Sequence, residues 1–73
     1  MNQRIILDPN VHHGKPVIKG TRVPVTRILG GLAGGMTCEE IIREYEVTEG
    51  DIQAALDYAA ELIDHEQVLA LGK

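Results

Sequence analysis

Residues 37–52, which read TCEEIIREYEVTEGDI, decide the fold because they hold one helix, its end and the start of the next helix. Thr37 followed by Glu40 is a capping box, in which each side chain bonds the other residue's backbone at a helix N-terminus. The helix behind it is expected to bury three residues, Ile41, Ile42 and Tyr45. Glu46-Val47 is expected to form a tight turn, and Thr48 is expected to cap the following helix.

Downstream, the sequence predicts a longer helix over residues 49–66. Its apolar residues recur at helical spacing: Ile52, Ala55, Leu56, Ala59 and Leu62 or Ile63. Three acids fall together on the outer face, Asp57, Glu61 and Asp64. The apolar segment 67–71 either continues this helix or docks on a partner, and the residues leave both alternatives open.

Upstream, Thr26 is expected to cap a first helix. The apolar face of that helix holds Ile28, Leu29 and Leu32. Gly34-Gly35 should end it, since glycine readily adopts the left-handed conformation found after helices. The run Gly30–Gly35 is not a phosphate-binding loop, because no Lys-Ser or Lys-Thr follows its glycines. It instead predicts a close packing contact at Gly30 or Gly31.

Residues 1–25 predict short extended pieces rather than a full sheet. Ile5-Ile6-Leu7 ends at a strong turn signal, and Val17-Ile18 and Val23-Pro24-Val25 can each be extended. Prolines cannot donate to a β-ladder, so these strands should be edges. We therefore expect a small β-hairpin or arm.

The predicted architecture is one mainly α domain, residues 1–73. It consists of a β arm or hairpin (1–25), a tri-helical helix-turn-helix unit (26–66) and a short tail (67–73).

The composition limits what such a domain can do. The chain has 73 residues, 44% of them hydrophobic, but Phe and Trp are absent. The core must therefore be thin, and a thin core of this size usually needs support from a partner subunit. The single Cys forms no internal disulfide. We expect self-association or a larger partner.

Catalysis, metals and cofactors are not expected. No nucleophile stands beside a base, and the acids lie mostly on the solvent face of one helix, so the chain is predicted not to be an enzyme. His12 and His13 are adjacent on an extended segment and point to opposite sides, which argues against a shared metal ion. The sequence has no apolar run long enough for a membrane span and no signal peptide, so we expect a cytoplasmic protein.

The charge is divided between the two halves of the chain. Residues 1–38 carry five Lys or Arg against one Asp, whereas residues 39–73 carry two against ten acids. The cations gather in the stretch HGKPVIKGTRVPV, residues 13–25. Lys15, Lys19 and Arg22 project from a backbone rich in Gly and Pro, and Thr21 adds a hydroxyl. Such a loop can bind a phosphate backbone or a carboxylate cluster, or can simply be solvated.

The segment Gly14-Lys15-Pro16-Val17-Ile18-Lys19-Gly20-Thr21-Arg22-Val23-Pro24-Val25 resembles the signature of a prokaryotic family of domains of unknown function. The resemblance extends over about residues 4–62. It implies a winged-helix or homeodomain-like fold. It also implies an antitoxin of a type II toxin–antitoxin pair, akin to VapB-type antitoxins, whose toxin is a PIN-like ribonuclease encoded by the neighbouring gene. Family members are thought to bind that nuclease and their own promoter DNA.

Three functions follow as hypotheses. The first is a non-enzymatic antitoxin that blocks the carboxylate cluster of a nuclease with Lys15, Lys19 or Arg22. The second is a homodimeric DNA-binding regulator. Because residues 49–66 hold no Lys or Arg, DNA contacts are expected from the basic arm, with Arg27 and Arg43 beside it. The third is a homo-oligomeric scaffold with no role in nucleic-acid binding.

Overall fold

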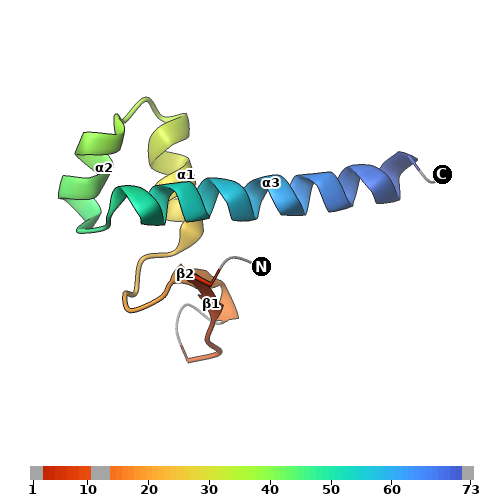
Figure 1. Cartoon of the computed structure of the whole chain (residues 1–73), viewed down its shortest axis with the longest axis horizontal. Coiled ribbons are helices and arrows are strands. Elements are labelled where there is room, and N and C mark those ends of the chain that lie inside the picture. The colour runs from red at the N-terminus through yellow and green to blue at the C-terminus, as the bar shows by residue number, and fades with distance from the viewer. Residues whose placement is uncertain (1–2, 11–13, 72–73) are drawn as a thin grey trace.

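Over the residues that the structure describes, the fold is mainly helical, with three helices and a two-stranded sheet (Figure 1). This computed structural model describes residues 3–10 and 14–71, and the side chains as far as residue 65. The elements in chain order are β1 (Ile5–Leu7), β2 (Pro16–Ile18), α1 (Val25–Ala33), α2 (Cys38–Tyr45) and α3 (Glu49–Leu71). The predicted mainly α architecture with a short N-terminal hairpin is confirmed.

The two strands form an antiparallel hairpin beneath the helices. Ile5 pairs with Ile18 and Leu7 pairs with Pro16. Ile5 and Ile18 are both buried in the core that the helices share. The hairpin is therefore held to the helices by its own apolar residues.

Helix α1 begins earlier than the sequence predicts. Its N-cap is Pro24, whose carbonyl accepts a hydrogen bond from the backbone N–H of Arg27 at 3.0 Å. Thr26 lies inside the first turn and does not cap the helix, so that prediction was wrong. Val25 is buried at the first helical position, and this burial sets the helix start. Val25 is accordingly helical rather than extended, whereas Pro24 makes an isolated antiparallel bridge to Val17.

The ends of α1 and α2 follow the local signals in the sequence. Gly34 is the C-cap of α1 and Gly35 adopts a φ of 98°, as expected for glycines that end a helix. Thr37 and Glu40 form both hydrogen bonds of the predicted capping box, at 3.1 and 2.8 Å. Glu46 then takes the left-handed conformation, with a φ of 56°, and the chain turns into α3.

Helix α3 is capped by Thr48 as predicted, since the backbone N–H of Asp51 donates to the Thr48 hydroxyl oxygen at 3.1 Å. The helix does not stop at residue 66. Its backbone remains helical to Leu71, so the segment 67–71 follows the alternative in which it continues the helix.

The core lies where the hairpin, α1, α2 and the first half of α3 meet. Its buried residues are Ile5, Val17, Ile18, Val25, Ile28, Ile41, Val47, Ile52, Ala54, Ala55 and Tyr58. Leu29, Leu32, Ile42 and Tyr45 are partly buried against it. The close contact predicted at Gly30 or Gly31 is at Gly31, where an added Cβ would lie 3.0 Å from the Met36 sulfur.

The predicted buried face of α3 is partly wrong. Ala54 and Tyr58 are buried, whereas Leu56 is 49% exposed. Leu62 and Ile63 are also about half exposed, at 47% and 55%. Figure 1 shows the reason, since α3 runs on past the other helices and strands that the structure describes, and its second half lies away from them.

Candidate functional site: a basic loop after the β-hairpin

The candidate site is the basic loop, residues 15–22, which contains β2 and the turn that follows it. The turn has Gly20 at a φ of 82°, a conformation that suits glycine. It is closed by a hydrogen bond from the Thr21 N–H to the Ile18 carbonyl at 3.0 Å. The Ile18 N–H in turn donates to the Val23 carbonyl at 2.9 Å.

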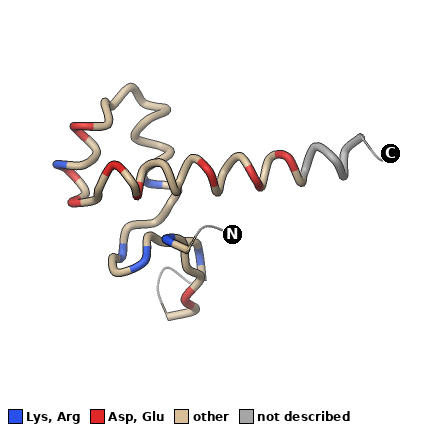
Figure 2. Tube along the Cα trace, in the orientation of Figure 1, with Lys and Arg blue, Asp and Glu red and all other residues tan. Residues whose placement is uncertain are grey.

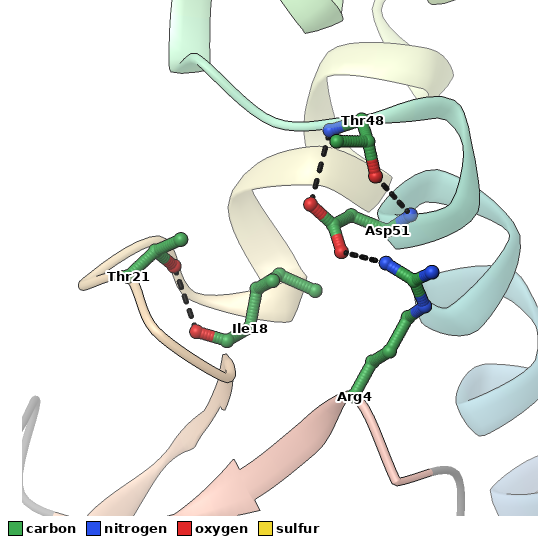
Figure 3. Close-up of polar contacts among 5 residues, drawn as sticks. All are labelled: Arg4, Ile18, Thr21, Thr48 and Asp51. Atoms are coloured by element: carbon green, nitrogen blue, oxygen red, sulfur yellow. Dashed lines mark hydrogen bonds and ion pairs between the residues drawn. The ribbon is translucent and has the colours of Figure 1, made fainter.

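The Thr21 hydroxyl holds this turn together. It donates its proton to the Ile18 carbonyl at 2.8 Å (Figure 3) and accepts a hydrogen bond from the Val23 N–H at 3.0 Å. A hydroxyl has one proton to give. Thr21 therefore cannot donate to a bound anion while this turn stands, and its role in the loop is to fix the backbone.

The cations of the loop are exposed. Lys15, Lys19 and Arg22 all present their side chains to solvent. Figure 2 shows most of the Lys and Arg on the hairpin and the loop after it, and most of the Asp and Glu on α2 and α3. The charge division seen in the sequence thus becomes a division in space.

The two other predicted cations lie on different elements. Arg27 is exposed in the first turn of α1, and Arg43 is exposed in the last turn of α2. Helix α2 packs on α1 and α3 and lies apart from the hairpin in Figure 1. The structure therefore does not bring Arg43 together with the basic loop.

An anchor beside the loop was missed by the sequence reasoning. The Arg4 guanidinium donates to the Asp51 carboxylate at 2.9 Å, and the second oxygen of Asp51 accepts from the Thr48 N–H at 3.0 Å (Figure 3). Thr48 and Asp51 thus form a reciprocal cap at the start of α3. The signal was available, since a Thr followed three residues later by an acid has the spacing of a capping box.

The anchor also fixes the ionisation of Asp51. Burial raises the pKa of its carboxyl, but hydrogen bonds from the Thr48 backbone and from Arg4 outweigh burial, so the pKa lies below its ordinary value. Asp51 is therefore a carboxylate at neutral pH. The neighbouring Gly50 leaves room for the arginine, because a Cβ there would stand 3.0 Å from the Arg4 guanidinium.

The anchor also positions the loop. The Lys19 N–H donates to the Arg4 carbonyl at 2.7 Å, so the backbone that carries Arg4 holds the first residue of the turn. A chain of contacts therefore runs from α3 through Arg4 to Lys19. These contacts connect the basic loop to the start of α3.

No metal centre emerges from the described residues, among which no three His, Cys, Asp or Glu side chains lie close enough to share an ion. His12 and His13 lie outside the described residues. Within the part of the chain that the structure describes, no helix is both long and apolar enough to cross a membrane. The candidate site is defined by its exposed cations, Lys15, Lys19 and Arg22.

Comparison with known proteins adds two findings. The family model described as "Protein of unknown function (DUF433)" matches residues 5–59, which include the hairpin, the basic loop and the first half of α3. A Mycobacterium tuberculosis (strain ATCC 25618 / H37Rv) protein named "Putative antitoxin VapB45" is 38% identical over 56 residues. The matched region is 77% of this chain but only 23% of the relative's length. No solved structure is significantly similar to the chain.

Proposed function

Because the chain belongs to the DUF433 family of proteins of unknown function and has a relative named as an antitoxin, we propose that it is the antitoxin of a type II toxin–antitoxin pair. In this proposal it is not an enzyme and needs no cofactor. It binds a toxin and neutralises it by occupying the toxin's active site.

The observation that carries the proposal is the basic loop, whose turn is closed by hydrogen bonds. PIN-like ribonucleases hold clustered carboxylates around a metal ion, and such a cluster attracts cations that donate charge-assisted hydrogen bonds. Lys15, Lys19 and Arg22 are exposed on a turn whose backbone is closed by Thr21. A loop that is already ordered loses little conformational entropy on binding. We propose a PIN-like nuclease encoded by the neighbouring gene as the partner.

Co-purification tests this proposal. The tagged chain is expressed together with the product of the adjacent open reading frame, and the eluate is examined by size exclusion and for ribonuclease activity. We expect a stoichiometric complex that is inactive. Arg22→Ala and Lys19→Ala should weaken the complex and release ribonuclease activity.

Arg43→Ala is the matched control, because it removes one exposed cation from α2, away from the loop. It should leave inhibition unchanged. Full inhibition by Arg22→Ala and Lys19→Ala, or equal loss of inhibition with Arg43→Ala, would contradict a role for the loop.

A second candidate function is DNA binding by a homodimer with a helix-turn-helix of the homeodomain-like or winged-helix-like kind. The arrangement that favours it is α2 and α3 joined by residues 46–48. The exposed surface of α3 carries Glu49, Asp57, Glu61 and Asp64, and phosphates repel such a helix. DNA contacts in this proposal therefore come from the basic loop and Arg27, with Arg43 as an additional contact.

A gel shift with the DNA upstream of the gene, over a salt series, tests DNA binding. The logarithm of the affinity should fall linearly with the logarithm of salt concentration, and each lost phosphate contact should reduce the slope by about 1. Arg27→Ala should therefore lower the slope. If the wild-type chain causes no shift at low salt, the regulator function is wrong, whatever the outcome with the nuclease.

A homo-oligomeric scaffold is the remaining alternative. It predicts an oligomer whose state neither DNA nor the neighbouring gene product changes. The same co-purification distinguishes it from the antitoxin.

A further inference from the structure

The exposed apolar residues of α3 gather where the helix leaves the rest of the molecule. Leu56, Leu62 and Ile63 are about half exposed, and Ala59 between them is partly buried. Figure 1 shows the second half of α3 running clear of α1, α2 and the hairpin. The helix gives the molecule a longest extent of 43 Å against a shortest of 18 Å. Three half-exposed large aliphatic side chains within about two turns of one helix form a surface that favours a partner.

These residues form one stripe that continues from the core. Ile52, Leu56, Ala59 and Ile63 are spaced by four, three and four residues, which is the spacing of a helix that packs along another helix. Ile52 is buried inside the domain, Ala59 is partly buried, and Leu56 and Ile63 are about half exposed. Leu62 borders the stripe on the side of the core.

The charges decide what kind of partner the stripe fits. Asp57, Glu61 and Asp64 are exposed, and their spacing places them on the opposite side of α3 from the stripe. A cationic partner would be drawn to that acidic side. A partner that binds the stripe instead needs an uncharged, apolar helix face. Any acidic residues of that partner must point away from the contact.

A second copy of this chain presents such a face. When two stripes meet, both acidic sides point to solvent, so no like charges lie between the helices. In a parallel pairing the two hairpins and their helices would crowd the same end of the pair. In an antiparallel pairing they lie at opposite ends, and the helix dipoles also oppose each other favourably.

We propose that the stripe Leu56, Ala59, Leu62 and Ile63 is the interface of an antiparallel homodimer in which Leu56 of one copy faces Ile63 of its partner. The contact is isologous, because the same surface is used by both copies. This assignment deepens the homodimer of the proposed function by naming its surface. It leaves the basic loop available to another molecule and does not depend on the nuclease.

Sedimentation equilibrium over a dilution series tests the interface. The wild-type chain should be a dimer that dissociates on dilution. Ile63→Glu should raise the dimer Kd by about thirtyfold or more, the size of effect expected at a central interface residue. His65→Glu is the matched control, because it places the same charge two residues away on an exposed position outside the stripe. Its Kd should be close to that of the wild type.

Circular dichroism of both variants controls for folding, which neither change should disturb, since both residues lie beyond the core. A monomeric wild-type chain at every concentration would overturn the dimer. A dimer that Ile63→Glu leaves intact would overturn the surface. If the wild type is monomeric and Ile63→Glu abolishes the nuclease complex, the stripe binds the toxin and the proposal is wrong.

Disulfide trapping tests the orientation. Cys38 is exposed, so both trapping variants are made in a Cys38→Ser background. A mixture of Leu56→Cys and Ile63→Cys chains should form mainly the mixed disulfide on oxidation. Disulfides between identical positions would instead indicate a parallel pair and overturn the antiparallel arrangement.

Discussion

The Arg4 guanidinium lies 2.9 Å from the Asp51 carboxylate and joins two residues that are 47 positions apart in the chain. This contact links the residue before β1 to the first turn of α3. It differs from a surface ion pair because Asp51 is buried and also accepts the Thr48 N–H. Asp51 therefore serves the helix cap and the tertiary fold together.

The two residues of this ion pair should contribute unequally to the stability of the fold. Asp51→Ala loses the cap and the ion pair, so we expect the free energy of unfolding to fall by about 1–2 kcal/mol. Arg4→Ala should cost less, about 0.5 kcal/mol, because 55% of the Arg4 side chain is exposed. Urea unfolding of both single variants and the double variant gives the coupling energy. Equal losses for the two single variants would mean that Thr48 and Asp51 do not form a cap in solution.

The lowered pKa of Asp51 predicts a loss of stability in acid. Its stabilising contribution is fully present above the ordinary carboxyl pKa and disappears as the pH falls through the lowered value. Hydrogen bonds with the Thr37 backbone and side chain lower the pKa of the Glu40 carboxyl as well. The gap in stability between wild type and Asp51→Asn should therefore narrow as the pH falls from neutral to about 3. A gap that widens with acidity would contradict the assigned contacts.

The two glycines inside α1 should respond differently to alanine. At Gly30 an added Cβ meets nothing within 4 Å, so Gly30→Ala should stabilise the helix by about 0.5–1 kcal/mol. At Gly31 the Cβ would lie 3.0 Å from the Met36 sulfur and 3.4 Å from Ile41. Gly31→Ala should stabilise the protein less than Gly30→Ala does, or should destabilise it. Thermal unfolding of the pair measures the difference, and equal gains would place α2 farther from α1 than the structure does.

Helix α3 offers a test of which face is buried. Ile52→Ala should cost about 2–5 kcal/mol, since Ile52 is in the core. Leu56→Ala should change the stability of the dilute monomer by about 0.5 kcal/mol or less. Denaturant unfolding at high dilution compares the two. A large loss of stability for Leu56→Ala under those conditions would mean that Leu56 is buried in the monomer, as the periodicity of α3 predicts.

The turn at Thr21 can be tested without removing a charge. Thr21→Val deletes both hydrogen bonds of the hydroxyl, whereas Thr21→Ser retains the atoms that make them. We expect Thr21→Val to lower the free energy of unfolding by about 1–3 kcal/mol. If the proposed antitoxin function is right, Thr21→Val should also weaken binding of the proposed toxin. Thr21→Ser should remain close to wild type in both. If the two variants bind the toxin equally well, an ordered turn is not needed for recognition.

Local signals in the sequence predicted the elements whose hydrogen bonds close within a few residues. The Thr37–Glu40 capping box and the glycine end of α1 are of this kind. The start of α1 was placed wrongly because burial of Val25 prevailed over the capping preference of Thr26. Burial also decided the face of α3, since periodicity gives a helix face but not what packs on it.

The candidate site was likewise predicted only in part from the sequence. The exposure of Lys15, Lys19 and Arg22 was predicted from their charge and the surrounding glycines. The Thr21 hydroxyl was offered as a possible ligand for an anion, but the structure engages it in the turn, as is typical of a Thr next to a turn glycine. The contact between Arg4 and Asp51 depends on how the hairpin packs under α3, and no local pattern specifies a pair so far apart in the chain.

The Arg4–Asp51 anchor also has a consequence for synthesis on the ribosome. Strand β1 and the basic loop are made early, but the residues that hold them, Asp51 and Ile52, are made late. A two-stranded hairpin alone is marginally stable in water. The loop therefore takes up its final form only when the start of α3 has left the exit tunnel, and unfinished nascent chains cannot present it.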